Sequence, residues 1–271
     1  MSKIEKALGK AREEHGNLPA LVSVPGTAMV TERTARPETI SRMATSESRL
    51  LSAADLSWRG IIHPGRAEDP VVQVFRELRS KISVQCQGRN SVILVTGLKK
   101  GSGGSFVARN LAAAFAFDMG RTALLIDCDL KNPSVHQLID NASGPGLTDF
   151  LDDPNIDIGE IIQPVGIARY RAIAAGGLRE IPGEYFNSQN MRRLLDTVRQ
   201  RYMERFIILD GPQMQDIADI QVLSELSDFV IVVARYGRAT NAQIESCLNV
   251  INPGKLLGVV FNDEPRIPGF G

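Results

Sequence analysis

A glycine-rich stretch between a hydrophobic run and a helical segment, Gly97–Ser105 ("GLKKGSGGS"), contains the first residues that could do chemistry. Gly101, Gly103 and Gly104 have no side chains, so the backbone there can wrap closely around a phosphate and offer its N–H groups. A helix opening at Ser105 would add unpaired N–H groups and the positive end of its dipole, and the serine hydroxyl could hold Mg²⁺. The alternative is that these residues only make a tight turn and cap a helix.

Three aspartates form a second set of candidate chemical groups. Asp127 and Asp129 end the run "TALLIDCD" two residues apart, which places both side chains on one side of an extended chain. Asp210 ends another apolar run, "RFIILDG". Carboxylates at strand ends bind Mg²⁺ or take up a proton, although aspartate is also common where a buried strand leaves the core. Three carboxylates and a glycine loop at one sheet edge would be a more specific indication than any of them separately.

A parallel sheet would bring these residues together. The chain contains short apolar runs, most of them nearly continuous in Val, Ile and Leu, as in strands buried on both faces. They are "SVILVTG", "TALLIDCD", "ARYRAIAAG", "RFIILDG", "DFVIVVA" and "KLLGVVFN". Helices are expected between them, over residues 105–118, 187–203, 219–226 and 239–250. This alternation predicts an α/β fold with a doubly wound, mostly parallel sheet and a ligand site beyond the carboxyl ends of the strands.

Three parts of the chain differ in composition. Residues 1–16 place Ile4, Leu8 and Ala11 at helical spacing among charged residues, which predicts an amphipathic helix that either docks on a partner or is a solvated end. Residues 17–69 are rich in Ser, Thr, Ala, Pro and Arg, which indicates a partly disordered, flexible linker with a short segment around Trp58 to Ile62 packed on the domain. Residues 70–271 are predicted to form the α/β domain.

Charge and cysteine content limit the possible partners and the compartment. The 31 basic residues balance the 31 acidic ones, so overall charge favours neither nucleic acid nor an anionic membrane as the main partner. Three widely spaced cysteines in apolar surroundings indicate buried thiols in a reducing compartment. The sequence shows no signal-peptide pattern and no apolar run near the roughly 20 residues that span a bilayer, so a cytoplasmic location is expected.

These motifs together resemble those of a known family. "VILVTGLKKGSGGSFVARNLAAAFA", "GRTALLIDCDLKNPSVHQLI" and "RFIILDGPQ" are similar in order and separation to the Walker A, Walker A′ and Walker B motifs of bacterial tyrosine kinases. These kinases are ParA/MinD-like P-loop proteins that regulate capsule and exopolysaccharide export. The resemblance covers Pro70 to Asn262 and implies a P-loop NTPase fold of the deviant Walker type.

The resemblance implies roles for individual residues. ATP or ADP with Mg²⁺ would be the cofactor, Asp127 the catalytic base, and Asp129 a second catalytic carboxylate that helps to position metal and water. Ser105, Asp127 and Asp210 would hold the metal. The residues implied to bind the cofactor are Lys99, Lys100, Gly101, Ser102, Gly103, Gly104, Ser105, Phe106 and Asn262.

The chain also departs from the family pattern. Gly104 stands where the Walker A motif has a lysine, so the motif is degenerate; Lys99 or Lys100 is a candidate substitute, or both are solvated loop charges. The segment "NDEPRIPGFG" contains no tyrosine, whereas the kinases carry a C-terminal tyrosine cluster. The helix "PVVQVFRELRS" resembles the family's ring-assembly helix but has Gln73 in place of its glutamate, with Arg76 and Arg79 retained.

The expected function is therefore that of a tyrosine-kinase-like regulator of exopolysaccharide or capsule biosynthesis or export, with pseudokinase character. It would act through a membrane-bound polysaccharide chain-length or export protein at the inner face of the cell membrane, and self-associate through the helix of Gln73, Arg76 and Arg79. One alternative is an active ATP-dependent tyrosine kinase or ATPase that uses Lys99 or Lys100. A second is a ParA/MinD-like positioning ATPase.

Overall fold

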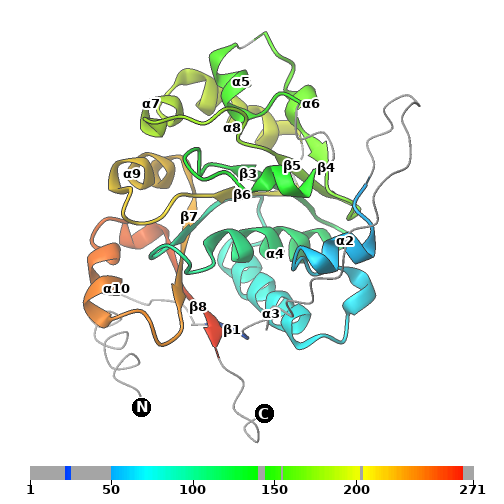
Figure 1. Ribbon diagram of the computed structural model, residues 1–271, viewed down its shortest axis with the longest axis vertical. Coiled ribbons are helices and arrows are strands. Elements are labelled where there is room, and N and C mark those ends of the chain that lie inside the picture. Colours follow the sequence, from blue (N-terminus) through cyan, green and yellow to red (C-terminus); the bar gives the residue numbers. More distant parts are fainter. Residues whose placement is uncertain (1–21, 26–49, 140–143, 154, 202–203, 265–271) are drawn as a thin grey trace, which may run out of the picture.

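The computed structural model describes residues 22–25, 50–139, 144–153, 155–201 and 204–264. In that part of the chain an eight-stranded sheet has the order β1-β8-β7-β2-β6-β3-β5-β4 (Figure 1). All neighbouring strands pair in parallel except β4, which is antiparallel to β5. The predicted α/β fold with a mostly parallel sheet is confirmed. The helix expected over residues 1–16 lies outside the described residues.

Six of the strands in the described sheet carry the predicted apolar runs. The other two, β1 and β4, were not predicted, and β1 lies within the segment expected to be a flexible linker. The bounds of the strands are β1 (Val22–Pro25), β2 (Val92–Gly97), β3 (Thr122–Asp127), β4 (Gln163–Pro164), β5 (Tyr170–Ile173), β6 (Arg205–Asp210), β7 (Phe229–Arg235) and β8 (Leu256–Glu264). The order in the sheet places β2 between β7 and β6, with β3 next to β6.

Helices connect the strands. Their bounds are α2 (Ala53–Trp58), α3 (Pro70–Gln85), α4 (Gly104–Ala116), α5 (Leu147–Asp152), α6 (Ile158–Ile161), α7 (Pro182–Phe186), α8 (Gln189–Arg201), α9 (Ile217–Leu226) and α10 (Asn241–Leu248). Short 3₁₀ turns span Pro64–Arg66, Val135–Leu138 and Pro253–Lys255. The longer helices begin and end within a few residues of their predicted positions.

The sheet separates two hydrophobic cores, which explains why its strands are apolar on both faces. Along β2, Ile93 and Val95 pack into the core with α3 and α4, whereas Leu94 packs into the core formed with α8, α9 and α10. On the first side, Phe115 of α4 stacks on Phe206 of β6 with ring centroids 3.9 Å apart. Alternating side chains of a single strand therefore bury apolar area in two layers, as a doubly wound sheet requires.

Helix α2 lies within the segment expected to be a linker. Ser52 and Asp55 form a capping box at its start, and six residues are too few for apolar periodicity to predict it from sequence. After it, Ile61 and Ile62 are buried, as expected of a segment packed on the domain, whereas Trp58 is 84% exposed. The fully buried side chain of Asn110 in α4 accepts a hydrogen bond from the Ile62 N–H at 2.7 Å and fixes this connection to the domain.

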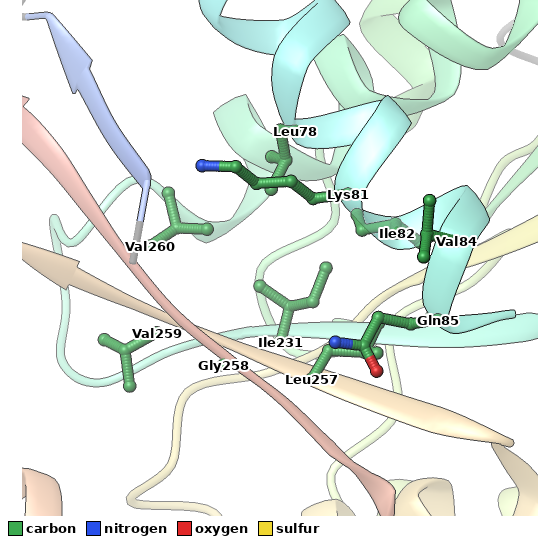
Figure 2. Close-up of a pocket in the computed structure, with 10 residues that line it drawn as sticks. All are labelled: Leu78, Lys81, Ile82, Val84, Gln85, Ile231, Leu257, Gly258, Val259 and Val260. Carbon is green, nitrogen blue, oxygen red and sulfur yellow. The ribbon is translucent and has the colours of Figure 1, made fainter. Parts of the chain in front are cut away.

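An apolar groove of about 250 Å³ separates the C-terminal half of α3 from strands β7 and β8. Figure 2 shows Leu78 and Ile82 of α3 on one side and Ile231 and Leu257 on the strands opposite, with Lys81 at the rim. The groove lies away from the carboxyl ends of the strands. None of the helices formed by the described residues is both long and apolar enough to cross a bilayer.

Candidate nucleotide-binding site

The glycine loop, Gly97–Ser105, leaves the carboxyl end of β2 in the middle of the sheet. The parallel register pairs Val95 with Asp210 across β2 and β6, and Asp210 with Asp127 across β6 and β3. The loop and the two aspartates therefore meet at one edge of the sheet. Asp129, two residues beyond Asp127, is partly exposed at the same edge.

The glycine loop is held by its own hydrogen bonds. The Lys99 N–H donates to Ser102 Oγ at 3.0 Å, and the Ser102 N–H donates back to the Lys99 carbonyl at 3.0 Å. Gly101 and Gly103 have φ angles of 79° and 89°, which favour glycine at both positions. The loop thus adopts a closed turn before α4.

Asn262, at the end of β8, lies against this loop. Its side-chain amide Nδ2 donates to the Ser102 carbonyl at 3.1 Å. A Cβ atom on Gly103 would lie 2.0 Å from the same nitrogen, so this close approach needs a glycine. Asn262 therefore contacts the loop backbone, while its expected place beside the adenine stays a prediction.

Gly104 is the first residue of α4 and gives the site no side-chain charge. A Cβ atom at this position would lie 3.0 Å from the Gly97 nitrogen, so a larger residue needs a shift of a few tenths of an ångström. Lys99 is partly exposed, Lys100 is exposed, and neither forms an ion pair within the described part of the chain. The ring of Phe106 packs edge-to-face on Phe75 of α3, which leaves its backbone N–H as the group available to an anion.

Asp127 is fully buried, and backbone donors hold its carboxylate in place. Oδ2 accepts from the N–H groups of Ser134 and Val135, each at 2.8 Å, and Oδ1 accepts from the Asp129 N–H at 3.3 Å. Burial raises the pKa of Asp127 to about 6 against the opposing effect of these bonds. Such a carboxyl can exchange a proton near neutral pH, which is compatible with the role of a base implied by the resemblance.

Asp210 is also fully buried but is poorly satisfied. Its Oδ1 has no hydrogen-bond partner in the described structure, and Ser134 Oγ contacts its Oδ2 at 3.5 Å. Burial first, and then the neighbouring Asp127, raise the pKa of Asp210 to about 8, while Arg109 and Ser105 oppose that rise. An unsatisfied buried carboxylate oxygen at a loop of this kind is a free ligand position.

The residues at this edge fit Mg²⁺ in part. Asp210 Oδ1 and the Ser105 hydroxyl offer oxygen donors that suit this hard cation, whereas Asp127 already accepts three backbone hydrogen bonds. No group of three His, Cys, Asp or Glu side chains is placed to hold a metal within the described ranges. Mg²⁺ bound here would therefore keep several waters and rely on phosphate oxygens, as it does in many nucleotide sites.

Three further residues of the site were missed by sequence reasoning. Ser134 contacts both buried carboxylates. Lys131 pairs with Asp216 at 2.6 Å and Asp219 at 3.3 Å, joining the loop after β3 to α9. Arg109 approaches Asp210 from α4; of the three, only Arg109 had a usable sequence indication, its spacing of four residues from Ser105 on a helix.

The helix expected to mediate self-association presents its arginines to a second cavity. Arg76, Arg79 and Arg169 line a space of about 260 Å³, and none of the described residues that line it carries a carboxylate. Arg79 donates to the Ala114 carbonyl and Arg169 to the Ala116 carbonyl, each at 3.2 Å. These bonds place two cations at the C-terminal end of α4, where the helix dipole favours them. Gln73 is exposed and donates instead to the Ala67 carbonyl at 2.8 Å.

The burial of Asp210 makes stability depend on pH. Because its pKa is about 8 in the folded chain and near 3.8 when unfolded, the stability gained from protonation is full below pH 4 and is lost as pH rises towards 8. We expect Asp210→Asn to remove this loss. The melting temperature of the variant minus that of the wild type should therefore be larger at pH 8 than at pH 5. The relative gain should be on the order of several °C, at about 2–4 °C per kcal/mol.

Thermal unfolding followed by circular dichroism at both pH values measures this effect. Asp196→Asn, at an exposed position on α8, serves as the matched control and should show no relative gain. Parallel pH profiles for the wild type and Asp210→Asn would contradict the assignment of a raised pKa to Asp210.

The contact between Gly103 and Asn262 predicts a specific steric effect. Gly103→Ala and Gly101→Ala both force a residue with a Cβ into a positive φ, but a Cβ at Gly101 meets nothing within 4 Å. We expect Gly103→Ala to lower the free energy of unfolding by about 1–3 kcal/mol more than Gly101→Ala, because it must displace Asn262. Urea titration measures the difference. Equal losses in the two variants, or no relief when Asn262→Ala is added to Gly103→Ala, would show that the contact is not tight.

Comparison with known proteins identifies relatives of the chain. No family model matches it. It is 31% identical over 198 residues to EpsB of Ralstonia solanacearum, covering 72% of this chain and 26% of EpsB. It is 27% identical over 201 residues to the tyrosine-protein kinase Wzc of Salmonella typhimurium, covering 73% of this chain and 27% of Wzc. The chain therefore spans about a quarter of the length of these relatives.

Solved structures share the fold. The kinase domain of the Escherichia coli tyrosine kinase ETK superposes with a TM-score of 0.72 at 24% identity, covering 96% of each chain. The BceF tyrosine kinase domain superposes with a TM-score of 0.70 at 23% identity, covering 94% of this chain and 98% of that domain. By its relatives and its fold, the described domain is a member of the bacterial tyrosine kinase family of P-loop proteins.

Proposed function

We propose that this chain is a nucleotide-binding, kinase-like regulator of exopolysaccharide or capsule biosynthesis or export that does not itself catalyse efficient phosphoryl transfer. The observation that carries the proposal is Gly104, which leaves the loop without its usual cation, while the positive φ angles of Gly101 and Gly103 and the start of α4 just after them suit a loop that binds phosphate. In this proposal the nucleotide is a structural ligand. It sets the conformation that a membrane-bound export or chain-length protein recognises.

The size of the missing interaction separates binding from turnover. One charge-assisted hydrogen bond contributes roughly 1.5–3 kcal/mol, which weakens binding but does not abolish it when backbone N–H groups and Mg²⁺ still hold the phosphates. Loss of one preorganised electrostatic contact to a transition state costs about 100- to 1000-fold in rate. The buried Asp127 and Asp210 are still present. Gly104 therefore removes a positive charge next to the phosphates but leaves the two carboxyl groups unchanged.

Restoring the lysine tests this assignment. We expect Gly104→Lys to tighten binding of Mg-ADP by about 10- to 100-fold, because the new ammonium group adds one charge-assisted hydrogen bond. Gly104→Met is the matched control, since it adds a Cβ and a chain of similar length without charge. Calorimetric titration of the full chain measures both. Equal affinities for the Lys and Met variants would mean that the site does not use a cation at this position.

A second candidate function is an active ATP-dependent tyrosine kinase or ATPase that uses Lys99 or Lys100. The observation that favours it is that both lysines lie in the glycine loop without an ion pair in the part of the chain described. This candidate predicts phosphate transfer from labelled ATP that falls at least about 100-fold in Asp127→Asn and in Lys99→Ala or Lys100→Ala. The pseudokinase proposal predicts no transfer in any of these proteins.

The arginine-lined cavity supports self-association as part of the function. Arg76, Arg79 and Arg169 carry three positive charges into one cavity, which suits a carboxylate side chain supplied by another copy of this chain. Buried Nε of Arg169 has no hydrogen-bond partner in the described structure, which leaves a donor available to such a group. In this arrangement Gln73, which stands where the family helix has a glutamate, weakens the contact between two copies without removing it.

Charge reversal in this cavity tests the self-association. We expect Arg76→Glu to shift the chain towards monomer, by about 10-fold or more in its dissociation constant, because a carboxylate would then meet a carboxylate. Sedimentation velocity over a range of concentrations measures the shift. Arg193→Glu, exposed on α8, is the control for net charge. An unchanged distribution in Arg76→Glu, or an equal shift in both variants, would contradict the role of this cavity.

A further inference from the structure

Arg109 occupies a position in the candidate site that neither the loop motif nor the carboxylates account for. It lies on α4 four residues after Ser105, and residues at this spacing share one face of a helix. The face that brings Ser105 to Asp210 therefore also carries a guanidinium group one turn further along.

Local contacts hold this turn of α4 in place. The hydroxyl of Tyr170, a fully buried residue on β5, donates to the Arg109 carbonyl at 3.1 Å. The Arg109 side chain is partly buried, and its Nε is enclosed without a hydrogen-bond partner in the described structure. Arg169 and Arg179 also have an enclosed Nε without a hydrogen-bond partner in the described structure, but Arg109 is the one of the three that lies on the helix after the glycine loop.

The unsatisfied groups lie near one another. Arg109 and Ser105 share one face of α4, and Tyr170, which bonds to the Arg109 carbonyl, lies on β5 next to β3. Burial raises the pKa of both the Asp210 carboxyl and the Tyr170 hydroxyl, and the positive charge of Arg109 opposes both rises. Asp210 Oδ1 is itself buried and without a partner. The site thus combines an enclosed donor on a cation with an enclosed acceptor on a carboxylate, and the two do not bond to each other in the described structure.

We propose that Arg109 supplies the positive charge that the loop lacks at Gly104, and that its guanidinium binds phosphate oxygens of a nucleotide held between the loop and Asp210. This inference rests on the proposed function, because it requires a nucleotide in the site. A guanidinium has five N–H donors in a planar fork that matches phosphate oxygens. It can therefore donate to a phosphate from its outer nitrogens while its charge still compensates Asp210.

The competing explanation is that Arg109 is only a structural counter-ion of Asp210. In that case its removal would destabilise the fold and weaken every ligand to the same extent, whatever the number of phosphates. If Arg109 binds phosphate, its removal should lower nucleotide affinity by a factor that increases with the number of phosphates. A lysine at position 104 should restore that affinity. Binding and stability measured on the same variants separate the two.

The experiment is a calorimetric titration of the full chain with Mg²⁺ and either AMP, ADP or ATP. We expect Arg109→Ala to weaken ADP and ATP about 10- to 100-fold and AMP by a smaller factor, and Arg109→Lys to retain most of the affinity. In the Gly104→Lys background, Arg109→Ala should cost less than about 3-fold, because the new lysine replaces the charge. Arg193→Ala, on the exposed face of α8, is the matched arginine control and should bind as the wild type does.

Each outcome decides the inference. If the wild type binds ADP and Arg109→Ala binds it equally well, Arg109 is not the missing cation, although the proposed function stands. If the wild type binds no nucleotide, both fail. Equal losses for AMP, ADP and ATP, or the same loss in the Gly104→Lys background, would assign Arg109 a structural role. Should Arg109→Ala melt at a much lower temperature, Arg109→Gln and Arg109→Lys provide the comparison, and lysine should bind ADP at least about 10-fold more tightly than glutamine.

Discussion

Two buried carboxyl groups on adjoining strands set the constraint on which the rest of this site depends. Asp127 and Asp210 are register partners at the ends of β3 and β6, and both are fully buried. Two negative charges side by side without water are strongly unfavourable, and burial raises the pKa of both groups. The chain stabilises one of them with three backbone N–H groups and leaves an oxygen of the other unsatisfied. Any cation that enters, whether metal or side chain, is attracted to that oxygen.

The absence of a lysine at position 104 is compatible with an intact fold, because different residues determine the shape of the loop and the charge that it offers to a phosphate. Loop shape depends on backbone hydrogen bonds between Lys99 and Ser102 and on the close contact of Gly103 with Asn262. The positive charge offered to a phosphate would come from the side chain at position 104, and Gly104 has none. A chain can therefore lose catalytic charge while keeping a folded phosphate loop, and this separation underlies the proposal of a regulator that binds without turnover.

Much of this architecture could be predicted from the sequence, for a physical reason. Strands buried on both faces must be apolar throughout, so the unbroken apolar run of Ile93, Leu94 and Val95 is enough to indicate a sheet between two helical layers. Convergence of the loop with Asp127 and Asp210 then follows from the parallel order. The remaining features depend on tertiary contacts. Helix α2 is too short for periodicity, the roles of Ser134 and Arg109 arise from side chains that meet across elements, and the bond from Asn262 to Ser102 joins residues 160 positions apart.

In the proposed function, nucleotide binds at this loop and is not turned over. The most direct measurement incubates the full chain in excess over γ-labelled ATP with Mg²⁺, recovers the protein-bound label by rapid filtration, and identifies it by chromatography. We expect label to be retained on the protein as intact ATP over many minutes. Label recovered as free phosphate or as phosphotyrosine within that time, or no retained label at millimolar protein, would contradict the proposed function.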